Sequence, residues 1–201
     1  MKRILVLISA LLMLNLGYSQ TAEEYFNRGK AKFDLQDFKG AIADHTKAIE
    51  LAPEKPGPFF NRGMAKYALQ DYAGAIADFT KGIEMDPENV DAYYNRGTVK
   101  VDFQDNIGAI ADFNRVIEIN PKHANCYYNR GLAKFNLRDP RGAMADFSKA
   151  IEVNPKHEVA YYMRGLTKIL LDQKDSGCMD LSKAGELGLA KAYEMIKKFC
   201  Q

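Results

Sequence analysis

The sequence predicts an all-α solenoid in which helical hairpins of one design stack side by side. A glycine returns every 34 residues, and each time it ends the same short phrase of an aromatic pair, a residue that is Asn in four copies and Met in the weaker fifth, and Arg. Within each unit, the apolar and small residues follow the 3.6-residue period of a helix instead of the alternation of a strand. A fixed period of this length indicates stacked repeats and not one globular domain with one active site. The recurring glycines are Gly29, Gly63, Gly97, Gly131 and Gly165.

The first 19 residues differ from the rest and predict a secretory signal peptide over 1–19. Lys2 and Arg3 precede an apolar run at 4–14, and small residues stand before an expected cleavage at Gln20. The alternative is an uncleaved anchor, but the run is well below the ~18 residues needed to span a bilayer. Cleavage predicts an exported protein that is periplasmic or extracellular.

The charge balance argues against a nucleic-acid partner. The chain has 28 Lys and Arg against 26 Asp and Glu, and loss of Lys2 and Arg3 with the signal leaves 26 of each. A neutral, evenly mixed surface lacks the basic patch of a nucleic-acid binder. No second apolar stretch is long enough for a membrane helix, so we expect no stable membrane span after signal removal.

Each repeat is predicted to hold two antiparallel helices, numbered here so that the recurring glycine is position 8. The first helix ends near position 14. In the first four repeats the second helix follows an Asp N-cap at position 16 and stops at a proline at position 32, which the fifth repeat lacks. The small Gly at position 8 faces Ala at position 20 and lets the helices approach closely. Pro56-Gly57-Pro58 is expected to fray the start of the second repeat. The repeats span 22–55, 56–89, 90–123, 124–157 and 158–188.

The C-terminal segment 189–201 is predicted to be a helix that caps the exposed apolar edge of the array. Its antiparallel return would bring Cys200 next to Cys178 in the last repeat, which predicts a disulfide between them. The alternative is a pair of reduced, packed thiols. Cys126 would then be free, as a semi-buried packing residue near the edge of the inner groove.

The pattern of an aromatic at position 4, Gly at 8, Ala at 20, an aromatic at 24, Ala at 27 and Pro at 32 resembles the tetratricopeptide repeat (TPR). The resemblance covers residues 22–188, nearly all of the mature chain. With the expected signal peptide, the chain resembles an exported bacterial TPR protein of five tandem repeats. It implies a right-handed solenoid of antiparallel helix pairs with a C-terminal capping helix. It also implies a protein or peptide partner, with no cofactor.

The resemblance further implies that positions 2, 5, 6, 9, 12 and 13 of the first helices line a concave groove. Position 5 is aromatic in every repeat, and position 6 is Asn in the first four. A carboxamide can pair with the N–H and the C=O of an extended peptide together. The alternative is that both columns are inherited scaffold. The predicted peptide-binding residues are Phe26, Asn27, Phe60, Asn61, Tyr94, Asn95, Tyr128, Asn129 and Tyr162.

A column of arginines at position 7 is matched by a column of aspartates at position 23. One of each per repeat predicts a structural ion pair between the two helices, because a partly buried guanidinium needs a partner. Binding of an anion is the alternative, and lysines at position 11 are expected to reach outward along the same seam. The predicted pairs are Arg28–Asp44, Arg62–Asp78, Arg96–Asp112, Arg130–Asp146 and Arg164–Asp180.

No catalytic or metal-binding arrangement is predicted. His45 takes the aromatic place at position 24 and is expected to pack, while His123 and His157 lie one full repeat apart. Even adjacent helices lie ~8–10 Å apart, too far for one ion to bridge two repeats. The predicted function is a non-enzymatic scaffold that binds an extended peptide or protein segment in its concave groove. The alternatives are a structural subunit of an envelope complex that uses its convex face, or a regulator of an exported enzyme.

Overall fold

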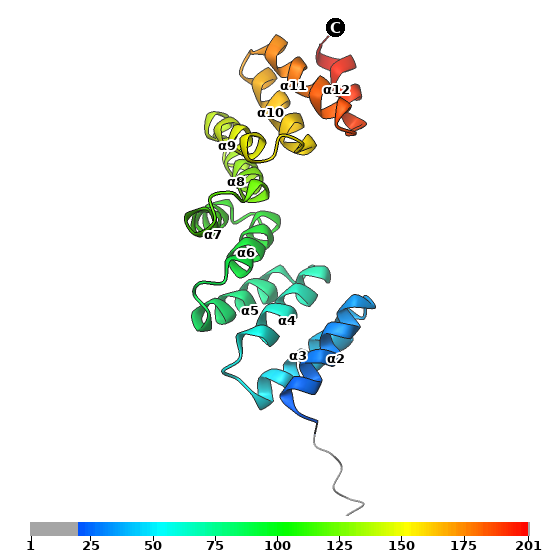
Figure 1. Cartoon of the computed structure of the whole chain (residues 1–201), viewed down its shortest axis with the longest axis vertical. Helices are drawn as coiled ribbons and strands as arrows, with labels where there is room; N and C mark the ends of the chain where they lie inside the picture. The colour runs from blue at the N-terminus through cyan, green and yellow to red at the C-terminus, as the bar shows by residue number, and fades with distance from the viewer. Residues whose placement is uncertain (1–19, 201) are drawn as a thin grey trace, which may run out of the picture.

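The structure, a computed structural model, describes residues 20–200, so the expected signal peptide at 1–19 lies outside the described residues. Over this range the chain forms eleven helices and no strand, as an all-α right-handed solenoid. The body formed by the described residues is elongated, with α2 and α12 at its opposite ends (Figure 1). The helix pairs are α2 (Ala22–Asp34) with α3 (Phe38–Leu51), α4 (Pro56–Ala68) with α5 (Tyr72–Met85), α6 (Val90–Asp102) with α7 (Asn106–Ile119), α8 (Ala124–Asn136) with α9 (Pro140–Val153), and α10 (Glu158–Leu170) with α11 (Lys174–Glu186), followed by α12 (Lys191–Phe199).

The second helices of the first four repeats begin at the predicted Asp N-caps. The side chain of Asp37 accepts a hydrogen bond of 2.9 Å from the backbone N–H of Gly40. A Cβ on Gly40 would collide with the carboxylate of Asp37 as it is placed here, so glycine at this position lets the carboxylate lie close to the backbone N–H that it caps. The sequence analysis did not recognise this second glycine column, which comprises Gly40, Gly74, Gly108 and Gly142.

One residue in the left-handed region reverses the chain between the two helices of each repeat. In the third repeat this residue is Gln104, with φ of 65°, and it follows directly after the C-cap of α6. Such a residue ends a helix because the next N–H groups turn back to the last carbonyls. The position carries no glycine in any repeat, so the backbone there is strained. The equivalents are Gln36, Gln70, Arg138 and Asp172.

The prediction that Pro56-Gly57-Pro58 frays the second repeat is wrong. Helix α4 begins at Pro56 itself, and Pro58 is buried in its first turn. The first N–H groups of a helix have no partner inside the helix, so prolines at the first and third positions remove no hydrogen bond.

The core lies between the two helices of each repeat, around the ring at position 24. Phe79, Phe113 and Phe147 are fully buried there. The glycine at position 8 faces this ring more closely than it faces the alanine predicted from the sequence. A Cβ on Gly97 would lie 2.8 Å from the ring of Phe113. The glycine column therefore makes room for an aromatic ring.

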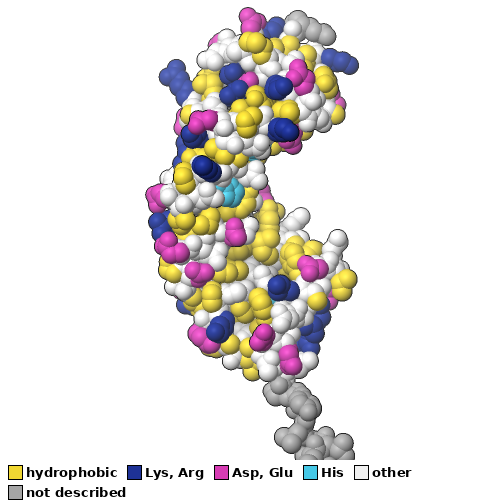
Figure 2. All heavy atoms as spheres, viewed as in Figure 1, with side chains coloured by type: hydrophobic (Ala, Val, Ile, Leu, Met, Phe, Trp, Pro, Cys, Tyr) yellow, Lys and Arg dark blue, Asp and Glu magenta, His cyan; other side chains and the backbone are white. Residues whose placement is uncertain are grey.

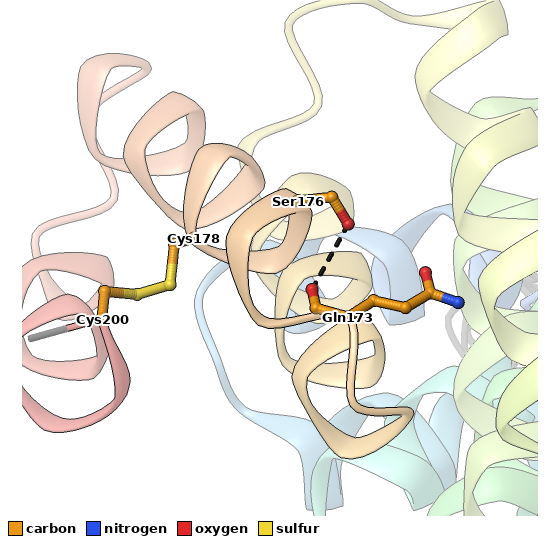
Figure 3. Close-up of a disulfide and its surroundings, with 4 residues drawn as sticks. All are labelled: Gln173, Ser176, Cys178 and Cys200. Atoms are coloured by element: carbon orange, nitrogen blue, oxygen red, sulfur yellow. Dashed lines mark hydrogen bonds between the residues drawn. A yellow bond between two sulfur atoms is a disulfide. The ribbon is translucent and has the colours of Figure 1, made fainter.

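The C-terminal helix α12 packs against α11 and is tied to it covalently. Cys178 of α11 and Cys200 at the end of α12 form a disulfide, with 5.8 Å between their Cα atoms (Figure 3). Ala192 of α12 is fully buried, and Tyr193 lies against Gly185. The last repeat is therefore covered at its C-terminal edge.

Cys126 is more deeply placed than the sequence suggested. It is fully buried, not semi-buried, and its thiol donates a hydrogen bond of 3.3 Å to the carbonyl of Phe113. Burial raises the pKa of Cys126 to about 12. The thiol is thus a packing group that joins the third and fourth repeats.

Candidate inner-face binding site

The first helices of the repeats form the inner side of the solenoid. Besides packing within each hairpin, α2 touches α4, α4 touches α6, and α6 touches α8. On the side shown in Figure 2 the outline is hollowed beside the middle repeats, and apolar side chains gather on the same side of the molecule. We call the side chains at positions 5, 6, 9, 12 and 13 of these helices the inner face.

The aromatic rings at position 5 are half-buried packing groups, which differs from the expected placement opposite the packing side. The ring of Tyr94 lies 6.2 Å from Phe113 on its own hairpin and 4.8 Å from His123 of the next repeat. Tyr128 lies similarly against Phe147 and His157. A long side chain at the border of the inner face leans onto both neighbours, so only part of each ring faces solvent.

The asparagines at position 6 divide into two groups. The Asn129 amide donates hydrogen bonds to the Tyr94 hydroxyl at 3.1 Å and to Thr98 at 3.4 Å, across the boundary between two repeats. In the repeats before Asn61 and Asn95, position 5 is a phenylalanine, which has no hydroxyl to accept such a bond. Within residues 20–200 no hydrogen-bond partner occupies the amides of Asn61 and Asn95. Free carboxamides therefore lie in the N-terminal half of the inner face.

Other inner-face groups bond across the repeat boundaries. The Tyr67 hydroxyl donates a 2.5 Å hydrogen bond to the carboxylate of Asp102, and burial together with that bond raises the pKa of Tyr67 to about 12. The Asn136 amide donates to Asn106 at 3.0 Å. These bonds tie the second repeat to the third and the third to the fourth, and they use polar groups that a ligand could otherwise contact.

A pocket of about 250 Å³ opens on the inner face between α2 and α4. One of its walls is His45, which is fully buried and whose two ring nitrogens both lack a hydrogen-bond partner. Burial lowers the pKa of His45 to about 4, so the ring is neutral at pH 7. The pocket is lined by Lys30, Phe33, Asp34, His45, Asn61 and Met64.

The predicted Arg–Asp pairs are present in all five repeats. In the second repeat, Arg62 donates two hydrogen bonds to Asp78, at 2.9 and 2.7 Å. A third bond, of 3.1 Å, runs from Arg62 to Thr46 in the preceding repeat. Each guanidinium therefore joins its own hairpin to the one before, or to Gln20 in the case of Arg28. The remaining pairs are Arg28–Asp44, Arg96–Asp112, Arg130–Asp146 and Arg164–Asp180.

The lysines at position 11 do not reach outward as expected. Lys66 binds the second carboxylate oxygen of Asp78 at 2.8 Å. The lysine at position 11 binds the aspartate at position 23 in the same way in the other four repeats. One buried carboxylate is thus shared by two cations, because a single guanidinium leaves acceptor sites on it free. The two cations beside Asp44 lower the pKa of its carboxyl to about 2. The arginines are engaged in structural contacts, which argues against the anion-binding alternative.

Repeated hairpins, held together by identical ion clusters and lined on one side by first helices, define a helical-repeat scaffold. The chain belongs to the tetratricopeptide-repeat family. Family profiles described as tetratricopeptide repeat match 22–55, 90–123 and 124–157, and a profile described as TPR repeat matches 63–102. Members of this family are typically non-catalytic scaffolds, and the fold implies protein or peptide partners.

Solved structures of similar proteins share this fold. A crystal structure of MamA is 25% identical, covers 82% of this chain and 96% of its own, and has a TM-score of 0.77. MamA from Desulfovibrio magneticus RS-1 is 22% identical over 83% of this chain and 94% of its own, with a TM-score of 0.79. YrrB, described as a TPR protein with an unusual peptide-binding site, is 24% identical over 88% and 92%, with a TM-score of 0.76. No curated protein matches the sequence.

The described residues also bear on membrane and metal sites. Across residues 20–200, no helix combines the length and the apolar character that crossing a membrane requires. In the same part of the chain, no three residues of His, Cys, Asp or Glu are grouped so that they could hold a metal ion.

Proposed function

We propose that the protein is an exported, non-enzymatic interaction scaffold that binds an extended peptide segment along the N-terminal half of its inner face. The observation that carries this proposal is the pair of unpartnered amides of Asn61 and Asn95, one repeat apart. The description of the similar protein YrrB as peptide-binding supports it.

The geometry of the first helices sets the register of such a peptide. Contacting helices lie about 8–10 Å apart, and an extended chain advances about 3.3 Å per residue. Successive asparagines would therefore meet backbone groups about three residues apart. Each amide can donate to a carbonyl and accept from an N–H, so the contacts read the backbone and not the side chains.

The experiment compares the double variant N61A/N95A with the unchanged chain in capturing peptides from a random display library. Both amides are free, so their loss should leave folding intact while capture falls at least about 10-fold, from two neutral hydrogen bonds. The matched control is K47A/K81A, in which the substituted side chains are exposed on the second helices α3 and α5. Equal capture by N61A/N95A and the control would refute the proposal.

Alanine substitutions at position 5 would not serve this test. The rings of Tyr94 and Tyr128 pack between hairpins, so their removal would disturb the scaffold itself. Binding and folding would then be lost together.

We propose export on the strength of the sequence at 1–19, with a basic start and a short apolar run. Cell fractionation and N-terminal sequencing test this directly. A chain that begins at Gln20 in the exported fraction is the expected result, and an intact Met1 in the cytoplasm contradicts it.

A second candidate function is a structural subunit that docks through one edge of the solenoid. The hydrophobic residue at position 14 is exposed at the hairpin turns of the first four repeats, with Leu35 80% exposed and Phe103 52% exposed. A row of such residues along one edge favours a protein contact there. The double variant L35E/F103E should then lose a native complex on gel electrophoresis while N61A/N95A keeps it.

A further inference from the structure

In the third and fourth repeats, a histidine lies against the aromatic ring at position 5. The ring centroids are 4.8 Å apart for Tyr94 and His123, and 5.2 Å apart for Tyr128 and His157. Both histidines stand at position 34, directly before the first helix of the next repeat. The first repeat carries Lys55 at this position. Its own ring at position 5 therefore receives no histidine from the boundary with the second repeat.

That ring is Phe26, and it is placed within its hairpin as the tyrosines are in theirs. It lies 5.7 Å from His45, the residue at position 24, just as Tyr94 lies 6.2 Å from Phe113. Towards the second repeat it borders a space of about 400 Å³ between the starts of α2 and α4, which we call the Phe26 hollow. Besides Phe26, Glu23 and Lys55, the lining consists of Ala22, Ala52, Pro56, Gly57 and Pro58.

The lining is apolar at positions that carry polar side chains in later repeats. Ala52 stands at position 31, which is Asp or Asn in the next three repeats. Gly57 stands at position 2, where the third and fourth repeats have Asp91 and Asn125. A Cβ on Gly57 would already lie 3.4 Å from the ring of Phe26, so glycine keeps this side of the hollow open. The prolines on either side of Gly57 add apolar walls without a polar side chain.

The size and the charges of the lining determine the kind of occupant. A space of about 400 Å³ exceeds the roughly 150 Å³ of an engineered cavity that binds benzene, so a large aliphatic or aromatic side chain fits. A charged side chain would lose hydration against the apolar walls. Glu23 and Lys55 carry opposite charges, so an ion of either sign would also meet a like charge. The hollow therefore favours a large uncharged, apolar group.

The free amide of Asn61 connects this hollow with the inner face. Gly57 and Asn61 are four residues apart on α4, so they lie one above the other on the same face of the helix. One helical turn spans about 5.4 Å. This is less than the advance of two residues in an extended chain, at about 3.3 Å each. A peptide whose backbone is held at Asn61 can therefore place the side chain of that residue or of the next one in the hollow.

We propose that the Phe26 hollow receives a large apolar side chain of the bound peptide, aromatic or aliphatic. The inference rests on the proposed function of the inner face and adds the chemistry of one anchor residue. Exchange of that anchor for alanine should weaken binding at least about 10-fold, because the hollow removes the apolar surface of the larger side chain from water.

The test uses the N-acetyl methylamides of phenylalanine, leucine and alanine as probes, titrated into the full chain and followed by the methyl NMR signals of its alanines. We expect the phenylalanine and leucine probes to shift the signals of Ala22 and Ala52 and to bind at least about 10-fold more tightly than the alanine probe. The signal of Ala124, at the equivalent of Ala22 in the fourth repeat, is the internal control. Equal affinities for the three probes, or shifts that spare both Ala22 and Ala52, overturn the proposal.

The variant K55H should fill the hollow, because a histidine at position 34 lies against the ring in the third and fourth repeats. It should fold for the same reason, and Lys55 makes no capping hydrogen bond that would be lost. We expect its affinity for the phenylalanine probe to fall at least about 10-fold. The matched control K55A removes the same amine without adding a ring, and should change the affinity by less than about 2-fold. An unchanged affinity in K55H, or an equal loss in K55A, overturns the proposal.

Sedimentation of the full chain shows whether a second copy is the occupant instead. We expect the unchanged chain, K55H and K55A to sediment alike. A dimer that K55H dissolves and K55A keeps would assign the hollow to a second copy and overturn the proposal.

The capture experiment separates this inference from the proposed function. If N61A/N95A abolishes peptide capture but K55H and K55A capture equally well, the inference about the hollow fails and the groove stands. If the phenylalanine probe binds at Ala22 and Ala52 while capture is unaffected by N61A/N95A, the hollow stands and the groove fails.

Discussion

Replacing His45 by phenylalanine should stabilise the first repeat at neutral pH and remove most of the acid sensitivity of that repeat. His45 is fully buried, without partners for its ring nitrogens. In the unchanged chain the folded state must keep this ring neutral, whereas the unfolded chain can protonate it. At neutral pH, removal of the unpaired polar groups should contribute about 1–3 kcal/mol.

The pH dependence follows from the difference between the two states. The pKa of His45 is lowered from 6.5 to about 4, chiefly by burial and further by Arg62, while Asp44 opposes the shift. Because the unfolded state binds the proton more tightly, the stabilisation is complete above pH 6.5 and is lost as the pH falls towards 4. At pH 4.5 the loss reaches about 2.5 kcal/mol. The carboxyl of Asp44, with its pKa lowered to about 2, loses its contribution only at lower pH.

Amide hydrogen exchange in α2 and α3 is the suitable assay, since a terminal repeat of a solenoid can open without the rest. The opening free energy is compared at pH 7.5 and pH 4.5 in the unchanged chain and in H45F. The unchanged chain should lose about 2.5 kcal/mol more than the variant in the first repeat. His157 is also buried and has a lowered pKa, so the fifth repeat should keep its own acid sensitivity in both proteins.

Equal pH dependence of the first repeat in H45F and the unchanged chain would refute this reasoning. It would mean that a solvent molecule or an ion already satisfies the imidazole in the folded state. A variant less stable than the unchanged chain at pH 7.5 would show that the phenylalanine does not fit where the next three repeats hold one.

Three further predictions concern the scaffold. The substitution D112N removes the carboxylate that holds Arg96 and a lysine, and should lower the free energy of unfolding by about 3 kcal/mol in urea denaturation, because two partly buried cations lose their partner. Reduction of the disulfide between Cys178 and Cys200 should destabilise the chain by about 3 kcal/mol, given the 22-residue separation, when thermal unfolding is followed with and without reductant. Replacement of Gln104 by Gly should raise the free energy of unfolding by about 0.5–1 kcal/mol, since its φ of 65° costs a side chain more than it costs glycine.

Each of these has a control within the chain. The substitution E118Q breaks an exposed pair with Arg115 and should change stability by less than about 1 kcal/mol; a loss as large as that of D112N would contradict the burial argument. The double variant C178S/C200S should not respond to reductant, and a response would assign the effect elsewhere. Glycine at the exposed helical position Ala111 should destabilise by about 1 kcal/mol, so a loss of stability in Q104G would refute the strain at Gln104.

Much of the scaffold could be predicted because each unit repeats the same local rules. Asp37 and its equivalents mark the start of a helix, and Arg28 and Asp44 recur at constant spacing, so one partner predicts the other. The fraying expected at Pro56 was wrong because a helix start tolerates prolines that a helix interior does not. The error arose because proline was treated as a helix breaker without regard to its position in the first turn of the helix.

The candidate site was predicted less well, since it depends on contacts between repeats. The helical wheel placed Tyr94 on the free side, but a ring of its length reaches both Phe113 and His123. Asn129 looked equivalent to Asn61 in sequence, yet a hydroxyl one repeat earlier occupies its amide. A periodic pattern shows which residues share a face but not which of them a neighbouring repeat has already engaged.

The sequence by itself determined the number of hairpins, their approximate ends and the ionic seam, because these depend on spacing along the chain. Only the tertiary structure decided which amides of the inner face stay free and where a pocket remains. The pocket between α2 and α4 is lined by side chains of α2, α3 and α4, which only the packing of these helices brings together. Such a space is a property of three-dimensional packing, which spacing along the chain does not encode.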